Sequence, residues 1–317
     1  MVGRVLLGAG LLACLFAMSR SVHAADEDGA KGGLAVIYPD IGEPYSSVFA
    51  TIIDGIEDRV RSKVPSFAIA KGNASSLPDQ LRARHVRAVI ALGRSGLQVA
   101  AGLDRQMNVV AGGVLSVPAA DADDMFVQSL APDPALLFGQ LKSLAPGVRR
   151  VWVVYDPKQN DWLIRLARDA ARLHGLELQA VAADDLKSAV KRYQDLFANL
   201  NAKRDALWLP QDYTTVDESV VVPLVLKAAW DQSLLVFSSN VAHVRRGVLF
   251  SLYPDNAEMG RHLAATALAS LQPGGGPPHG VQALRQVLTA VNTRTAEHLG
   301  VDLRTSQQRI QLVLPEQ

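Results

Sequence analysis

The sequence predicts an α/β fold in which two lobes, each a doubly wound parallel sheet, are joined by a hinge. Short apolar runs alternate with amphipathic segments along most of the chain, and apolar strands separated by helices are typical of parallel sheets covered on both faces. This alternation occurs twice, with a looser stretch between the two series. A chain of 317 residues also exceeds the size of one ordinary hydrophobic core.

The first series of elements begins near residue 34. Its expected strands are residues 34–38, 67–70, 88–92 and 108–112, and its expected helices are residues 48–64, 77–84 and 96–103. In the first of these helices Ile52, Ile53, Ile56 and Val60 recur at the spacing of one helical face. This order of elements predicts a complete β-α-β-α-β unit.

The second series begins near residue 151. Its expected strands are residues 151–155, 176–182, 206–209 and 234–237, and its expected helices are residues 161–174, 184–200 and 216–230. Gly175 is a typical stop signal for the helix before it. Beyond this series we expect a strand at 247–253, a helix at 257–271, a loop rich in glycine and proline at 272–280, a strand at 288–292 and a helix at 293–299.

The chain is expected to change lobes three times, the last time between residues 288 and 289. Residues 116–124 have turn and acidic character, so residues 125–130 form a candidate strand that carries the chain across. A return is expected near residues 240–246. We therefore assign residues 25–128 and 245–288 to an N-terminal lobe, and residues 129–244 and 289–317 to a C-terminal lobe.

Residues 1–24 have the features of a signal peptide. Arg4 precedes an apolar stretch at residues 5–18, and Val22 and Ala24 place small or medium residues where a signal peptidase cleaves. Cleavage after Ala24 predicts a protein of the periplasm. A lipid anchor at Cys14 is the alternative, but the apolar run continues past this cysteine, which favours simple cleavage.

Composition excludes several functional classes. Loss of Arg4 and Arg20 with the signal peptide lowers the basic residues from 32 to 30 against 31 acidic residues, a net charge of −1, which does not suit nucleic-acid binding. Cys14 is the only cysteine, so a mature chain without it has no disulfide, thiolate metal ligand or cysteine nucleophile. The segment that contains Asp121, Asp123 and Asp124 lacks the glycine and the distal glutamate of a calcium-binding loop. No metal or cofactor is expected.

The candidate ligand-binding residues follow from one rule of open α/β sheets. Ligands lie beyond the carboxyl ends of the strands, where helix N-termini direct free N–H groups. In this chain the corresponding loops carry hydroxyl, amide and charged groups together with tyrosine rings, which suit a small polar ligand. The candidates are Tyr45, Ser46, Arg94, Ser95, Gly96, Tyr155, Asn160, Gln211, Asp212, Tyr213, Asn240 and Tyr253.

Two of these candidates have competing interpretations. The motif disfavours Ser95 as a hydrolase nucleophile, because Leu97 replaces the last glycine of Gly-x-Ser-x-Gly and no histidine follows a predicted strand with an acidic partner. Ser95 either caps the next helix or, in addition, helps to receive a ligand carboxylate. Asp212 follows a strand, so it either pairs with a ligand ammonium or caps a helix.

Several segments resemble the ABC-transporter substrate-binding proteins of the type I periplasmic binding fold, in a branch that includes predicted tryptophan or tyrosine binders. They are "ALGRSGLQVA", "LWLPQDYTTVDESVVVPLVLKAAWDQSLLVFSSN", "GVLFSLYPDNAEMGRHLAATALASL" and "AVNTRTAEHLGVDL". The resemblance implies a ligand between the lobes, held by Arg94 and Ser95 and by Asn160, Asp212 and Asn240. Gln211 and Asp212 stand where the family usually has an Asp-Asn pair, and "VLSVPAADADD" replaces its usual Asp-Pro-Val stretch.

We therefore expect a non-catalytic, monomeric receptor for a small polar metabolite, which an amino acid would satisfy. Its expected partners are an ABC permease and ATPase. One alternative is a ligand sensor coupled to a sensor kinase or to a surface uptake system. The other is an exported hydrolase that uses Ser95.

Overall fold

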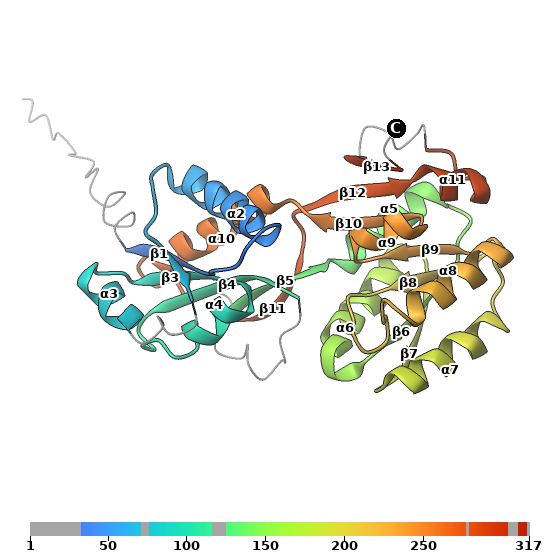
Figure 1. Ribbon diagram of the computed structural model, residues 1–317, viewed down its shortest axis with the longest axis horizontal. Helices are drawn as coiled ribbons and strands as arrows, with labels where there is room; N and C mark the ends of the chain where they lie inside the picture. The colour runs from blue at the N-terminus through green and yellow to red at the C-terminus, as the bar shows by residue number, and fades with distance from the viewer. Residues whose placement is uncertain (1–32, 71–75, 116–124, 277–278, 304–309, 316–317) are drawn as a thin grey trace, which may run out of the picture.

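The computed structural model describes residues 33–70, 76–115, 125–276, 279–303 and 310–315. Within these residues the chain forms two lobes, each with its own sheet and covering helices (Figure 1). The expected architecture of two doubly wound, mostly parallel sheets is confirmed. The expected signal peptide, Cys14 and the aspartates Asp121, Asp123 and Asp124 lie outside the described residues.

The first sheet has, in the described part of the chain, the parallel strand order β11-β5-β4-β3-β1-β2. Its strands are β1 (Leu34–Pro39), β2 (Ser66–Ile69), β3 (Ala88–Leu92), β4 (Asn108–Val114), β5 (Phe126–Pro132) and β11 (Gly280–Leu284). Helices α2 (Tyr45–Val60) and α10 (Asn256–Ser270) cover one face, and α3 (Leu77–Ala83) and α4 (Gly93–Ala100) cover the other. Because side chains alternate along a strand, Val36 and Ile90 pack toward the first pair of helices and Ile37 and Ala91 toward the second.

The second sheet has the described strand order β13-β12-β10-β9-β8-β6-β7, parallel except where β12 runs against β10. Its strands are β6 (Arg150–Tyr155), β7 (Glu177–Ala182), β8 (Asp205–Leu209), β9 (Leu235–Ser238), β10 (Phe250–Pro254), β12 (Val287–Asn292) and β13 (Leu312–Leu314). Its helices are α5 (Pro134–Leu144), α6 (Pro157–Leu173), α7 (Leu186–Phe197), α8 (Val221–Gln232), α9 (Val241–Arg246) and α11 (Thr293–Leu299).

The chain changes lobes between β5 and α5, between β10 and α10, and between β11 and β12. The expected return near residues 240–246 is wrong: this segment is helix α9, and β10 pairs with β9 and β12 in the second sheet. Residues 245–254 therefore belong to the second lobe, and the chain returns only after Pro254. The first lobe is expected to end at residue 128, but its strand β5 continues to Pro132.

The three crossings are joined to one another by hydrogen bonds. The Asp133 N–H donates to the Leu284 carbonyl at 2.8 Å, and the Asp255 N–H donates to the Gln286 carbonyl at 2.9 Å. The Gln128 amide bonds the Gln286 side chain at 2.7 Å. The crossings thus form one connected hinge rather than three independent linkers.

The core of the second lobe contains a group of buried aromatic rings. Phe237 stacks on Trp208 and on Phe250, and Phe138 meets Trp208 edge-on. The Trp208 indole N–H donates to the Ser239 hydroxyl at 3.0 Å, which satisfies its buried donor. No helix in the described ranges is both long and apolar enough to cross a lipid bilayer.

Helices α2 and α10 approach each other more closely than side chains would normally allow. A Cβ atom at Gly55 would lie 2.1 Å from the Ala257 carbonyl oxygen, and one at Gly260 would lie 2.1 Å from the Ile52 carbonyl oxygen. The backbones therefore touch at two points. This contact attaches α10, which comes late in the sequence, to the first lobe.

We expect Gly260→Ala to lower the free energy of unfolding by about 1–3 kcal/mol, because the added methyl group forces the two helices apart. This loss exceeds the gain of about 1 kcal/mol that alanine brings to a helix interior. Urea unfolding measures the change, with Gly147→Ala as the control, since no atom lies within 4 Å of a Cβ built there. Equal midpoints for the two variants would contradict the close approach.

Candidate functional site

A cavity of about 710 Å³ lies between the two lobes, at the carboxyl ends of their strands. On the first lobe its walls come from the end of β1 and the start of α2, from the first turn of α4, and from the end of β4. On the second lobe they come from the first turn of α6, the loop after β8, and the segment that joins β9 to α9. The position is the one that the strand-end rule predicts for a ligand.

Six of the twelve candidate residues line this cavity. They are Arg94, Ser95, Gln211, Asp212, Tyr213 and Asn240. Apolar side chains make up much of the remaining wall, among them Ile41, Phe49, Val114 and Val216. Polar groups in an otherwise apolar wall are typical of a small-molecule site, where the polar groups fix the orientation of the ligand.

The other six candidates do not line the cavity. Tyr45 and Ser46 begin α2, where Ser46 borders a separate hollow, and Gly96 packs against the Ile37 carbonyl below α4. Tyr155 is buried at the end of β6, and Tyr253 packs against Val244 and Ala290. Asn160 is buried below the cavity wall, where its amide donates to Asp212 Oδ2 at 3.0 Å and to the Gln211 carbonyl at 3.1 Å.

Helix α4 begins at Gly93, three residues earlier than expected. Gly93 has φ +69°, a left-handed conformation that glycine adopts without strain, and it turns the chain directly from β3 into the helix. Ser95 therefore lies in the first turn, and the expectation that it caps the helix is wrong, since no side-chain cap bond is made. Arg94 and Ser95 are exposed to the cavity and have no hydrogen-bond or ion-pair partner among the described residues.

Asp212 is the centre of a buried hydrogen-bond network. Its carboxylate accepts from the backbone N–H groups of Asp156, Thr214 and Thr215 at 2.7, 3.0 and 2.9 Å. The side-chain amides of Asn160 and Gln159 add contacts at 3.0 and 3.4 Å. With only 5% of its surface exposed, Asp212 joins the loop after β8 to the start of α6.

Gln159 and Gln211 border the cavity with incomplete hydrogen bonding. The Gln159 amide N–H groups bond Asp156 and Thr214, and the Gln211 amide donates to the Ser239 carbonyl. The Oε1 atom of each side chain is buried and has no partner in the described part of the chain. An unpaired buried acceptor costs free energy that a new donor can recover.

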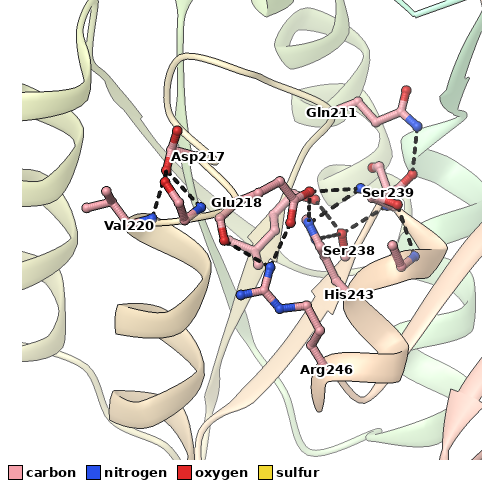
Figure 2. Close-up of polar contacts among 12 residues, drawn as sticks. Gln211, Asp217, Glu218, Val220, Ser238, Ser239, His243 and Arg246 are labelled. Atoms are coloured by element: carbon pink, nitrogen blue, oxygen red, sulfur yellow. Dashed lines mark hydrogen bonds and ion pairs between the residues drawn. The ribbon is translucent and has the colours of Figure 1, made fainter.

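A second network, around His243, forms the neighbouring wall (Figure 2). His243 is buried, and its Nε2 lies 2.8 Å from Glu218 Oε1 while its Nδ1 lies 2.8 Å from the Ser238 hydroxyl. Arg246 donates to Glu218 Oε2 at 2.8 Å, and the Asn240 amide donates to Glu218 Oε1 at 3.2 Å. Burial lowers the pKa of His243 from its ordinary value of 6.5, although Glu218 opposes this effect.

Ser238 contacts His243, and His243 contacts Glu218, as in a hydrolytic triad. The serine of this group, however, is not accessible to a substrate. Ser238 is fully buried, accepts from the Asn240 N–H and contacts the Leu209 carbonyl at 3.2 Å. A substrate therefore has no path to its hydroxyl. Within the described residues Ser95 has no histidine partner, and no cluster of three potential metal ligands occurs.

Sequence reasoning missed Glu218 and His243. The helix expected at residues 216–230 places Glu218 in its first turn, but α8 begins at Val221 and Glu218 lies in the loop before it. His243 fell in the segment expected to cross between lobes, which is helix α9. The signal that points to both is their place after β8 and β9, two neighbouring strands of the second sheet.

We expect the protein to lose stability as the pH falls below about 6.5, because unfolded chains then bind a proton at His243 that the native state, with its lowered pKa, does not. His262, whose pKa burial also lowers, acts in the same direction. Urea unfolding at pH 7.5 and 5.5 therefore shows a smaller loss for His243→Gln than for the unaltered protein. An equal loss in both would contradict the neutral state of His243.

Comparison with known proteins gives the family and the fold. The family described as ABC transporter substrate binding protein matches residues 139–310, more than half of the chain. No curated protein matches the chain.

Three solved structures share the two-lobed fold. A ligand-free, open substrate-binding protein with adhesive properties from Clostridium difficile has 15% identity and a TM-score of 0.64, covering 90% of this chain and 100% of that one. A conserved domain protein from Vibrio cholerae has 18% identity and a TM-score of 0.55, covering 89% and 100%. An ABC domain in complex with L-Trp from Streptococcus pneumonia has 15% identity and a TM-score of 0.54, covering 89% and 99%.

The family match begins within α5, covers most of the second lobe and includes α10 and β11 of the first lobe. The solved structures extend the shared fold over nine tenths of the chain. The fold is therefore that of the type I periplasmic binding proteins, as the sequence predicts. Members of the matching family bind a substrate and do not transform it, in agreement with the non-catalytic role expected from the sequence. The chain belongs to the ABC transporter substrate-binding protein family.

Proposed function

We propose that this protein is an exported receptor that closes its two lobes on a small polar metabolite and presents it to an ABC permease. The observation that carries the proposal is the cavity between the lobes, lined by strand-end loops of both sheets. A ligand that contacts both walls favours the closed arrangement over the open one, because it gains its full set of contacts only there. The bound state then differs in shape from the empty one.

Arg94 and Ser95 form the proposed subsite for an anionic group of the ligand. Both lie in the first turn of α4, where unpaired backbone N–H groups and the helix dipole favour a negative charge. Neither side chain is engaged by another described residue. A carboxylate placed there gains charge-assisted hydrogen bonds of roughly 1.5–3 kcal/mol each.

An amino acid fits the remaining walls. Ile41, Phe49 and Val216 offer apolar surface for a side chain, and Gln159 and Gln211 add polar side chains to the same cavity. The similar structure from Streptococcus pneumonia holds L-Trp. These features favour an amino acid among small polar metabolites.

The location and partners follow from the proposed role. A signal peptide at residues 1–24 would deliver the monomeric protein to the periplasm. There the closed form would meet a permease driven by an ATPase. A sensor kinase or a surface uptake system would recognise the same closed form, and the genes that flank this one distinguish these partners.

We expect the intrinsic fluorescence of the protein to change when its ligand binds, because Trp208 lies in β8 just before the cavity loop and bonds Ser239. A panel of amino acids, nucleosides, sugars and small carboxylic acids is titrated, and the melting temperature is recorded in parallel. A ligand at one hundred times its Kd adds about 2.7 kcal/mol to the stability. No response from any member of the panel would contradict the receptor role.

Loss of the anion subsite provides a second test. We expect Ser95→Ala to weaken the binding of a carboxylate ligand about tenfold, and Arg94→Gln to weaken it at least as much, because each removes a charge-assisted donor of roughly 1.5–3 kcal/mol. Isothermal titration calorimetry measures both. Ser47→Ala and Arg59→Gln, on the same lobe but outside the cavity, are the controls. An unchanged Kd for Ser95→Ala would reduce Ser95 to a structural residue.

A further inference from the structure

The two acidic side chains of the cavity wall differ in what they can still accept. Asp212 is 5% exposed and already receives five N–H donors, whereas a carboxylate offers about four acceptor positions. The side chain of Glu218 is 56% exposed. Asp212 is therefore saturated, and Glu218 is the acid that a ligand can reach.

Glu218 is also held in a fixed orientation. His243 and Asn240 contact its Oε1 at 2.8 and 3.2 Å, and Arg246 bonds its Oε2 at 2.8 Å and its backbone carbonyl at 3.0 Å. Because Oε2 has only the Arg246 contact in the described structure, an acceptor position remains open on it. Preorganised polar groups bind with a smaller loss of side-chain entropy than free ones do.

The charge of Glu218 is only partly balanced. Buried His243, with its lowered pKa, is neutral at pH 7, so its contact orients the carboxylate without cancelling the charge. Arg246 is the cation in contact with Glu218, and it binds the carboxylate through Nη1 alone. On the opposite wall, Arg94 has no partner among the described residues. The cavity thus has an available cation on one lobe and an available anion on the other.

We propose that Glu218 is the specificity-determining acceptor for a positively charged group of the ligand, a role that Asp212 is too enclosed to fill. This inference rests on the proposed receptor function and names its ligand class: a zwitterion whose anionic group meets Arg94 and Ser95 and whose ammonium group meets Glu218. His243, Asn240 and Arg246 are positioning residues, because they act on the ligand through Glu218.

The test compares ligands that differ only in the ammonium group. The twenty amino acids are titrated first by calorimetry, together with their deamino analogues, for example L-tryptophan with indole-3-propionate. For the amino acid that binds most tightly, we expect Glu218→Gln to weaken binding tenfold or more and to change the Kd of its deamino analogue less than twofold. Asp217→Asn removes the same charge one residue away, outside the cavity, and leaves both Kd values unchanged.

Each outcome decides between the proposals. Equal loss of both ligands in Glu218→Gln, or tighter binding of the deamino analogues by the unaltered protein, overturns the role of Glu218 and leaves the receptor function in place. No binding by any compound of the full panel overturns both. The comparison in the unaltered protein does not depend on a variant that folds, and Glu218→Asp, which keeps the charge, should keep the preference for the amino acid.

Discussion

The buried carboxylate of Asp212 sets the shape of the second wall of the cleft. Removing a charge from water is costly unless hydrogen bonds replace the lost hydration, and here backbone N–H groups from two separate loops do so. The start of α6 and the loop after β8 are thereby fixed to each other. Gln211 and Tyr213, on either side of Asp212, line the cleft, and the same loop continues to Glu218, which also lines it. Without this carboxylate, the three backbone N–H groups would lose their acceptor, and the loop after β8 would lose the hydrogen bonds that fix its conformation.

A second constraint acts at the first wall. The change from β3 to α4 takes place at one residue, Gly93, and a Cβ there would lie 3.2 Å from the Phe49 ring. The tight turn places Arg94 and Ser95 in the first turn of α4, whereas Gly96 and Leu97 are buried between α4 and the sheet. The two walls thus present their polar groups to the cavity in different ways. One presents an open helix terminus with free donors, and the other presents side chains held by a filled network.

Periodicity predicted most of the fold, because buried parallel strands are apolar on both faces and their helices are amphipathic. The runs at residues 34–38, 88–92 and 151–155 correspond closely to β1, β3 and β6. The strand-end rule likewise placed Arg94, Ser95, Gln211 and Asp212 at the cleft. It failed for Tyr155 and Tyr253, since a ring at a strand end packs inward as readily as it faces a cavity. The lobe assignment of β10 and the cavity position of Glu218 and His243 depend on which strands pair and where α8 begins, and local sequence does not specify either.

The passage of α10 and β11 back to the first lobe has a consequence for the order in which the chain becomes structured. The core of that lobe contains Met259, Leu263 and Leu284, which lie more than one hundred residues after its other strands in the sequence. The block from β6 to β9, by contrast, is contiguous. During synthesis, therefore, the second lobe acquires most of its central strands while the first still lacks helix α10 and the edge strand β11. Contacts of such long sequence separation form slowly, so the first lobe stays incomplete until nearly the whole chain has been synthesised.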